Sequence, residues 1–142
     1  MNEKIIHELL LIEDNDDHAE MTSYYLEEAL QGEVNIHRLS DGEKAINFIR
    51  DFNETSTLPS LIFLDLKIPK HDGHEILKKL KSHSNLKMVP VIVFTTSNSQ
   101  SDITRAYENH ANSYILKPIE VGKLKKIFKT IAHYWLINEK AL

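Results

Sequence analysis

The stretch "LIFLDLKIPKHDGHEIL", residues 61–77, joins four apolar residues to a single acid, Asp65, and then to a loop and a helical pattern. A short continuous apolar run is typical of a strand that is covered on both faces of a sheet. A carboxylate carried straight out of such a strand is costly to bury unless it has partners. The stretch therefore predicts a central strand that delivers Asp65 to a functional edge of a sheet.

Four further apolar runs read as strands, at residues 9–12, 34–39, 90–94 and 113–116. The segments between and after them repeat apolar residues at helical spacing, which predicts helices over 17–30, 40–52, 73–81, 101–109 and about 120–140. We expect Ser40 or Asp41 to cap the second helix, and Asn109 to close the fourth in the left-handed conformation. Strand alternating with helix five times predicts an α/β fold with a five-stranded parallel sheet and helices on both faces.

The composition suits one domain over residues 1–142, with 42% hydrophobic and 27% charged residues. The sequence contains no cysteine, which excludes disulfides, thiolate metal sites and cysteine nucleophiles. The net charge of −4, without a basic tail, gives no reason to expect a nucleic-acid partner. The first residues turn acidic too soon for a signal peptide or a membrane span, so we expect a cytoplasmic protein without a membrane partner.

Polar residues follow four of the five predicted strands. Glu13 and Asp14 follow the first strand, Asp65 the third, Thr95 the fourth and Lys117 the fifth. Ligands bind beyond the carboxyl ends of parallel strands, so these side chains should converge. Two ionised carboxylates about 4 Å apart repel by about 4 kcal/mol, so three of them require a proton or a cation. Oxygen ligands with open water positions favour Mg²⁺, which together with Lys117 would keep Asp65 ionised and nucleophilic.

Taken together, these segments resemble the receiver domains of two-component response regulators, the family that includes the chemotaxis regulator. The resemblance rests on "LLLIEDN", "LIFLDLKIPKHDGHEIL", "PVIVFTTS" and "YILKP", which span nearly the whole chain. It implies the flavodoxin-like, doubly wound fold with strand order 2-1-3-4-5. The combination of "TTSNS", "AYENHANSYILKP" and a long last helix with "HYWL" is more similar to the small regulators that serve phytochrome-type histidine kinases than to the chemotaxis type.

The resemblance also implies a role for each matching residue. Asp65 would be the phospho-acceptor that takes a phosphoryl group from a sensor histidine kinase or a phosphotransfer protein. Glu13, Asp14 and Asp65 would bind Mg²⁺ together with the backbone carbonyl of Lys67. Lys117 would pair with the phosphoryl group.

The remaining matches concern the switch and the loops around the site. Thr95 would hydrogen-bond the phosphoryl oxygen, and Tyr114 would change rotamer as Thr95 is drawn inward. Pro69 and Gly73 match the loop that closes over the site, and Pro118 would follow a cis peptide bond. The readout would lie on the fourth helix, fifth strand and fifth helix, which would contact a downstream protein or a second copy in a homodimer.

These matches predict a stand-alone signalling protein and not an enzyme. Two positions would set the lifetime of its phosphorylated state: Lys67, two residues after the acceptor, and Ser97, two after Thr95. Neither is an acid or amide that would orient an attacking water. We therefore expect slow self-dephosphorylation.

Other functions are less consistent with the residues. An aspartyl-phosphate phosphohydrolase would also use Mg²⁺, but it requires a second acid where Lys67 stands. A flavodoxin-like carrier requires a hydroxyl- and glycine-rich phosphate cradle after the first strand, where acids stand instead. A receiver-like adaptor that works without phosphorylation would not need a complete site. A transition-metal site is not expected from His18, His71 and His74, because they lack the His-x-x-x-His spacing on one helix.

Overall fold

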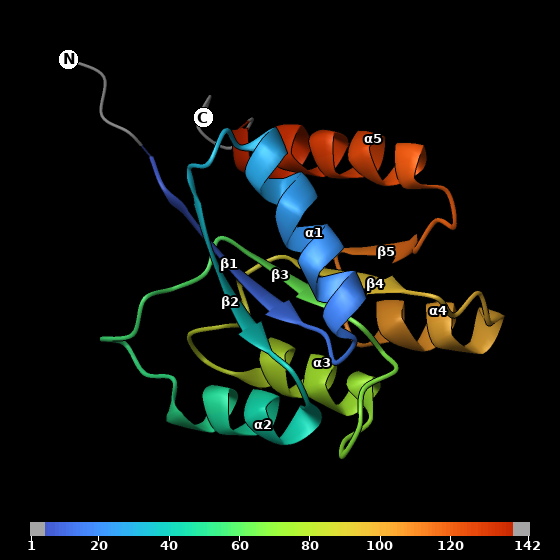
Figure 1. Ribbon diagram of the computed structural model, residues 1–142. Helices are drawn as coiled ribbons and strands as arrows, with labels where there is room; N and C mark the ends of the chain where they lie inside the picture. The colour runs from blue at the N-terminus through green and yellow to red at the C-terminus, as the bar shows by residue number, and fades with distance from the viewer. Residues whose placement is uncertain (1–4, 138–142) are drawn as a thin grey trace.

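The computed structural model describes residues 5–137, in which strands and helices alternate along the chain (Figure 1). The parallel strands pair in the order β2-β1-β3-β4-β5, as the resemblance implied. The elements are β1 (His7–Ile12), α1 (Asp16–Ala29), β2 (Val34–Leu39), α2 (Gly42–Asp51), β3 (Leu61–Leu64), α3 (Gly73–Ser82), β4 (Val91–Thr95), α4 (Gln100–Glu108), β5 (Ser113–Leu116), α5 (Val121–Ile131) and a terminal π-helix, η1 (Ala132–Ile137). The predicted α/β fold is therefore confirmed.

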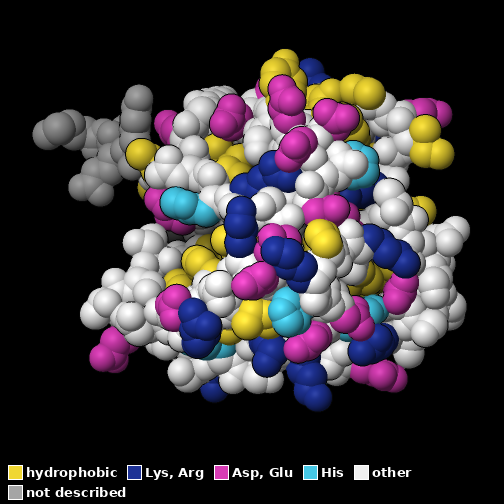
Figure 2. Space-filling view, turned by 60° about the horizontal axis from the view of Figure 1, so that its bottom comes forward, with side chains coloured by type: hydrophobic (Ala, Val, Ile, Leu, Met, Phe, Trp, Pro, Cys, Tyr) yellow, Lys and Arg dark blue, Asp and Glu magenta, His cyan; other side chains and the backbone are white. Residues whose placement is uncertain are grey.

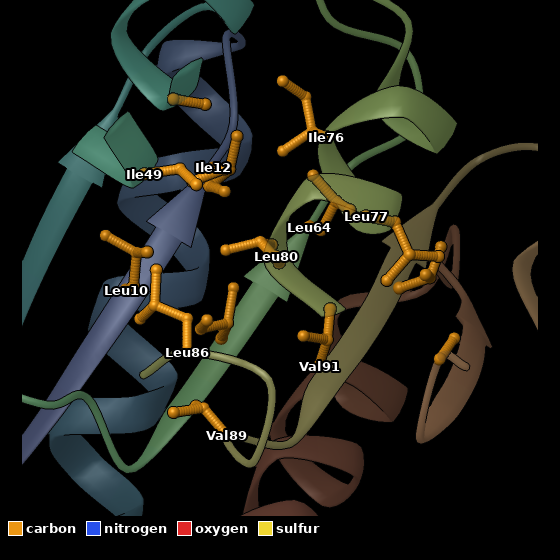
Figure 3. Packing of buried hydrophobic residues seen from close by; sticks show 14 of the residues in the cluster. Leu10, Ile12, Ile49, Leu64, Ile76, Leu77, Leu80, Leu86, Val89 and Val91 are labelled. Carbon is orange, nitrogen blue, oxygen red and sulfur yellow. The ribbon is translucent and has the colours of Figure 1, made fainter. Parts of the chain in front are cut away.

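The helices form two layers, with α1 and α5 on one face of the sheet and α2 and α3 on the other (Figure 1). Successive residues of β3 point to opposite layers: Ile62 and Leu64 pack towards α3, whereas Leu61 and Phe63 pack towards α5. All four are buried, which explains why this strand is continuously apolar. Figure 3 shows the layer on the α2–α3 face, in which side chains of the strands and of α3 interdigitate.

The layer on the α1–α5 face, called the second layer below, is centred on Phe128 of α5, whose side chain is fully buried. Its ring lies 5.8 Å from that of Phe63 and 5.2 Å from that of Phe94, in each case edge to face. Edge-to-face aromatic pairs add to the free energy gained from burial alone. This cluster therefore fixes α5 against β3 and β4, the strands that lead to Asp65 and Thr95.

Side-chain caps set the starts of the first two helices. The side chain of Asn15 accepts a hydrogen bond from the backbone N–H of His18, and that of Asp41 accepts one from Lys44, so Asp41 rather than Ser40 is the cap. The prediction for the end of α4 was wrong. His110, and not Asn109, adopts the left-handed conformation, with φ of 68°.

The end of α4 forms a Schellman motif, which explains why His110 takes this role. The N–H of Ala111 donates to the carbonyl of Ala106, and the N–H of His110 donates to that of Tyr107. This pair of bonds requires the left-handed residue one position beyond the cap, Asn109. Satisfying the last carbonyls of α4 thus places the strain on a histidine.

The last helix also differs from its prediction. The α-helix ends at Ile131 and continues as the π-helix η1, instead of remaining α-helical from about 120 to 140. Within η1, Ala132 and Leu136 are both buried in the second layer, because residues four positions apart share a face in this wider helix. Residues 138–140 of the predicted helix lie outside the described residues. Within 5–137, no helix has the length and apolar content needed to cross a bilayer.

Candidate functional site

The backbone brings the ends of the strands to one edge of the sheet. The N–H of Glu13 donates to the carbonyl of Leu39 at 3.1 Å, and the N–H of Asp65 donates to that of Ile12 at 3.0 Å. On the other side, the N–H of Lys117 donates to the carbonyl of Thr95 at 2.7 Å. The strand pairing therefore extends one residue beyond each strand and fixes where these side chains begin.

Lys117 lies at the centre of the site. Its ammonium group donates hydrogen bonds to Glu13 Oε1, to Asp65 Oδ2 at 2.8 Å and to His18 Nδ1 at 2.9 Å. The side chains of Lys117, Glu13 and Asp65 are only 7%, 3% and 8% exposed. Charged groups are buried this deeply only when they are paired. The buried Asp65 carboxylate therefore has the charged partner that its burial requires, the Lys117 ammonium.

The two buried carboxyl groups have pKa values shifted in opposite directions. Burial raises the pKa of Glu13 to about 7, although the hydrogen bond from Lys117 opposes this shift. Burial alone would also raise the pKa of Asp65, but hydrogen bonds from Lys117 and from the backbone N–H of Lys67, the latter at 3.0 Å, hold it below its usual value. Asp65 is therefore the carboxylate that stays ionised and nucleophilic near neutral pH.

Asp14 and His18 are arranged differently from the sequence expectation. Asp14 is exposed and is not among the residues whose ligand atoms gather at the site. His18 takes a place there instead: Glu13, His18 and Asp65 each offer one ligand atom, and these atoms lie within 4.8 Å of one another. The metal-binding role of Asp14 stays a prediction.

Sequence reasoning missed Arg38, which holds the chain where β1 leads into α1. Its guanidinium donates to the carbonyl of Glu13 at 2.9 Å and to that of Asp14 at 3.0 Å, and it lies 2.8 Å from a carboxylate oxygen of Asp16. The signal in the sequence was an arginine near the end of the edge strand β2. Arg38 thus fixes the backbone that carries Glu13 and Asp14.

The predicted switch residues meet at Ser97. Thr95 is fully buried, and its hydroxyl oxygen accepts a hydrogen bond from the N–H of Ser97 at 3.4 Å. The hydroxyl of Tyr114 donates to the carbonyl of the same Ser97 at 2.8 Å. One residue of the β4–α4 loop therefore links Thr95 to Tyr114.

The side chain of Ser97 is itself engaged. Its hydroxyl donates to Asp102 of α4 at 2.5 Å, and the other carboxylate oxygen of Asp102 lies 2.9 Å from Nε2 of the buried His74. His71 lies elsewhere, 3.8 Å from Glu75. Sequence reasoning did not foresee the contact between His74 and Asp102, because it joins two helices 28 positions apart.

The loop after Asp65 is held against the neighbouring helices. The carbonyl of Pro69 accepts a hydrogen bond from the N–H of Gly42 at 3.0 Å. A Cβ atom on Gly73 would lie 2.5 Å from Cα of Leu66, so only glycine fits where the loop returns to its start. Lys67 contributes its N–H to Asp65, while the role of its carbonyl in metal binding stays a prediction.

The predicted cis peptide bond before Pro118 is wrong, because the bond between Lys117 and Pro118 is trans. The trans form is favoured by about 0.5–1 kcal/mol even before proline. In this structure Lys117 reaches both Glu13 and Asp65 from the trans backbone.

The site suits a cation. The Lys117 ammonium already holds a positive charge between two carboxylates and an imidazole nitrogen. Carboxylate oxygens and imidazole nitrogen are also ordinary ligands of divalent metal ions. Glu13, His18 and Asp65 are therefore a group of described residues that could together hold such an ion.

Comparisons with known proteins agree with this geometry. The family model for the response regulator receiver domain matches residues 9–129. A probable methanogenesis regulatory protein, FilR2 of Methanothrix harundinacea, is 42% identical over 129 residues, covering 90% of this chain and 83% of FilR2. The response regulator Rcp1 of Synechocystis is 36% identical over 133 residues, covering 90% of this chain and 88% of Rcp1.

Solved structures of such regulators superimpose closely on the chain. The phosphorylated cyanobacterial phytochrome response regulator RcpA gives a TM-score of 0.85 at 33% identity, covering 94% of this chain and 96% of RcpA. The Mn²⁺-bound form of Rcp1 gives a TM-score of 0.78 at 35% identity, covering 92% and 94%. The predicted similarity to phytochrome-associated regulators is thereby confirmed. The chain belongs to the response regulator receiver domain family.

Proposed function

We propose that this receiver domain accepts a phosphoryl group on Asp65 and uses it to switch a protein-binding face. The observation that carries the proposal is the buried Asp65 carboxylate, whose pKa is lowered by hydrogen bonds from Lys117 and from the N–H of Lys67 that outweigh the effect of burial. An ionised carboxylate at a sheet edge is available as a nucleophile near neutral pH. A transferred phosphoryl group would then lie beside the Lys117 ammonium.

The transfer follows from the groups at the site. The bond between phosphorus and the donor's imidazole nitrogen breaks, and a bond forms between phosphorus and a carboxylate oxygen of Asp65. Receiver domains bind a divalent metal, and we propose Mg²⁺ here, which supplies positive charge to the carboxylates and the phosphoryl oxygens. Lys117 contributes a second positive charge from 2.8 Å away.

The switch would act through Ser97. A phosphoryl group adds about two negative charges and strong acceptor oxygens, which attract the hydroxyl of Thr95. Thr95 now accepts the N–H of Ser97, and the carbonyl of Ser97 accepts the hydroxyl of Tyr114. A movement of Thr95 towards Asp65 would therefore change the partners of Ser97 and release Tyr114. Packed elements respond to such a change by adopting a second discrete arrangement.

The face that would read out the switch carries exposed apolar side chains. Tyr107 of α4, Leu116 of β5, Ile119 and Val121 are between 46% and 100% exposed, although each is large and apolar. Neighbouring exposed apolar residues mark a surface for a protein partner. The face shown in Figure 2 carries basic, acidic and apolar side chains interspersed. The partner would be a downstream protein or a second copy of this chain.

The donor would be a sensor histidine kinase or a phosphotransfer protein. The similarity to RcpA, a cyanobacterial phytochrome response regulator, favours a phytochrome-type kinase. A cytoplasmic location stays a prediction, as does a single, stand-alone domain.

Labelling with a small phosphodonor tests the function. The protein is incubated with acetyl phosphate and Mg²⁺, and its intact mass is measured. We expect a gain of one phosphoryl group in the wild type and none in Asp65→Asn, while the exposed-site control Asp51→Asn is labelled normally. Failure of the folded wild type to label would favour an adaptor that works without phosphorylation. Size measured before and after labelling would show whether two copies associate.

A further inference from the structure

His18 is the group at this site that neither the proposed phosphoryl transfer nor the switch uses. It is the third residue of α1, and its backbone N–H donates to the capping side chain of Asn15 at 3.0 Å. This places its side chain on the first turn of the helix, beside the end of β1. Its Nδ1 lies 2.9 Å from Nζ of Lys117 and 3.8 Å from Oε1 of Glu13.

The contact with Lys117 fixes which form of the imidazole is present. An ammonium group has hydrogen-bond donors only, so Nδ1 of His18 must accept, and its lone pair must point into the site. The ring is therefore neutral, with its proton on Nε2. A neutral imidazole with an inward lone pair is the form that binds metal ions.

We propose that His18 is a nitrogen ligand of the divalent cation at the Glu13–Asp65 site, and that it raises the affinity of this site for transition-metal ions such as Mn²⁺ more than its affinity for Mg²⁺. The inference rests on the proposed function, because it concerns the same cation site. The three ligand atoms lie within 4.8 Å of one another, close to the roughly 4 Å that separates opposite ligands of one ion. All three atoms now accept hydrogen bonds from one cation, the Lys117 ammonium.

The expected preference follows from the nitrogen ligand. Mg²⁺ is a hard ion that favours oxygen ligands, whereas imidazole suits first-row transition metals. A site of carboxylates and carbonyls alone would lack this contribution. Replacing one nitrogen ligand should therefore weaken the binding of Mn²⁺ more than that of Mg²⁺.

Electron spin-echo spectroscopy of the full chain loaded with Mn²⁺ tests the proposal directly. A coordinated imidazole nitrogen modulates the echo of Mn²⁺, independently of any phosphorylation. We expect this modulation in the wild type and its loss in His18→Gln, a variant that keeps an acceptor for Lys117. The control is His133→Gln, because His133 is exposed in η1 and should leave the modulation unchanged.

Titrations of the same proteins measure the preference. His18→Gln should lose about 10-fold or more in affinity for Mn²⁺, with a much smaller loss for Mg²⁺ measured by competition. Circular dichroism confirms that the variant is folded, which we expect because the side chain of His18 is 39% exposed and the helix cap uses only its backbone. Mn²⁺ bound to the wild type without nitrogen modulation, or equal losses for both ions, would overturn the proposal. A wild type that binds neither ion would overturn the cation site itself.

Discussion

The raised pKa of Glu13 makes the stability of the protein depend on pH in a defined direction. Burial raises this pKa from the ordinary value of 4.5 to about 7. Between these values the folded chain holds one more proton than the unfolded chain, so the free energy of unfolding falls as the pH rises, and the fall ends above about pH 7. At 1.36 kcal/mol per pKa unit, the difference corresponds to about 3 kcal/mol.

Glu13→Gln removes this titration while keeping the size of the side chain and an acceptor for Lys117. We expect urea unfolding in EDTA to show that, between about pH 5 and about pH 8, the wild type loses about 2.5 kcal/mol more stability than the variant does. His18 has a lowered pKa and contributes the opposite slope below its ordinary value of 6.5, but it is present in both proteins, so their difference isolates Glu13.

Two controls accompany this experiment. Glu43→Gln alters a glutamate whose side chain is 61% exposed and should follow the wild-type curve. Mg²⁺ added at about pH 8 should restore stability to the wild type more than to Glu13→Gln, because a cation favours the ionised carboxylate. Equal losses of stability for Glu13→Gln and the wild type between the two pH values in EDTA would refute a raised pKa of Glu13.

Three further predictions follow from packing and from the loop. Phe128→Ala should lower the free energy of unfolding by about 3–5 kcal/mol in chemical denaturation, because it empties the centre of the second layer. The exposed-site control Tyr24→Ala should change it little, and a small loss for Phe128→Ala would contradict the packing. Gly73→Ala should lower the free energy of unfolding by about 1–3 kcal/mol, because its Cβ would meet the backbone of Leu66. Gly122→Ala, with open space around it, should not destabilise the protein, and equal effects of the two substitutions would contradict the close approach. The phosphorylated protein should lose its phosphoryl group slowly, since Lys67 is exposed and the hydroxyl of Ser97 is bound to Asp102; decay within seconds, followed after the donor is removed, would contradict this.

The sequence predicted the architecture well because a strand that is buried on both faces of the sheet appears in the sequence as a continuous apolar run. The apolar run before Asp65 could be read as a central strand, and the acids and the lysine after neighbouring strands could be placed at one edge. Glu13, Asp65 and Lys117 do meet there. These inferences needed only the rule that parallel strands end at the same edge of the sheet, whereas the strand order was implied by the resemblance.

The remaining features depend on side-chain directions that no periodicity encodes. His18 enters the site and Asp14 does not. The Asn15 cap orients the first turn of α1, which carries His18, and Arg38 holds the loop before it, which carries Asp14. The same limit applies at the end of α4, where a Schellman motif placed His110 and not Asn109 in the left-handed region. The π-helical end of the last helix likewise satisfies packing in the second layer without leaving a distinct pattern.

The most direct test of the account identifies the residue that carries the phosphoryl group. The protein is phosphorylated by acetyl phosphate with Mg²⁺, the acyl phosphate is reduced with borohydride to homoserine, and the peptides are sequenced by mass spectrometry. We predict homoserine at position 65, with no homoserine at Asp14 and no 5-hydroxynorvaline, the product from a glutamyl phosphate, at Glu13. Homoserine at a different aspartate, or a stable phosphoryl group on a histidine such as His18, would contradict the assignment of Asp65 as the acceptor.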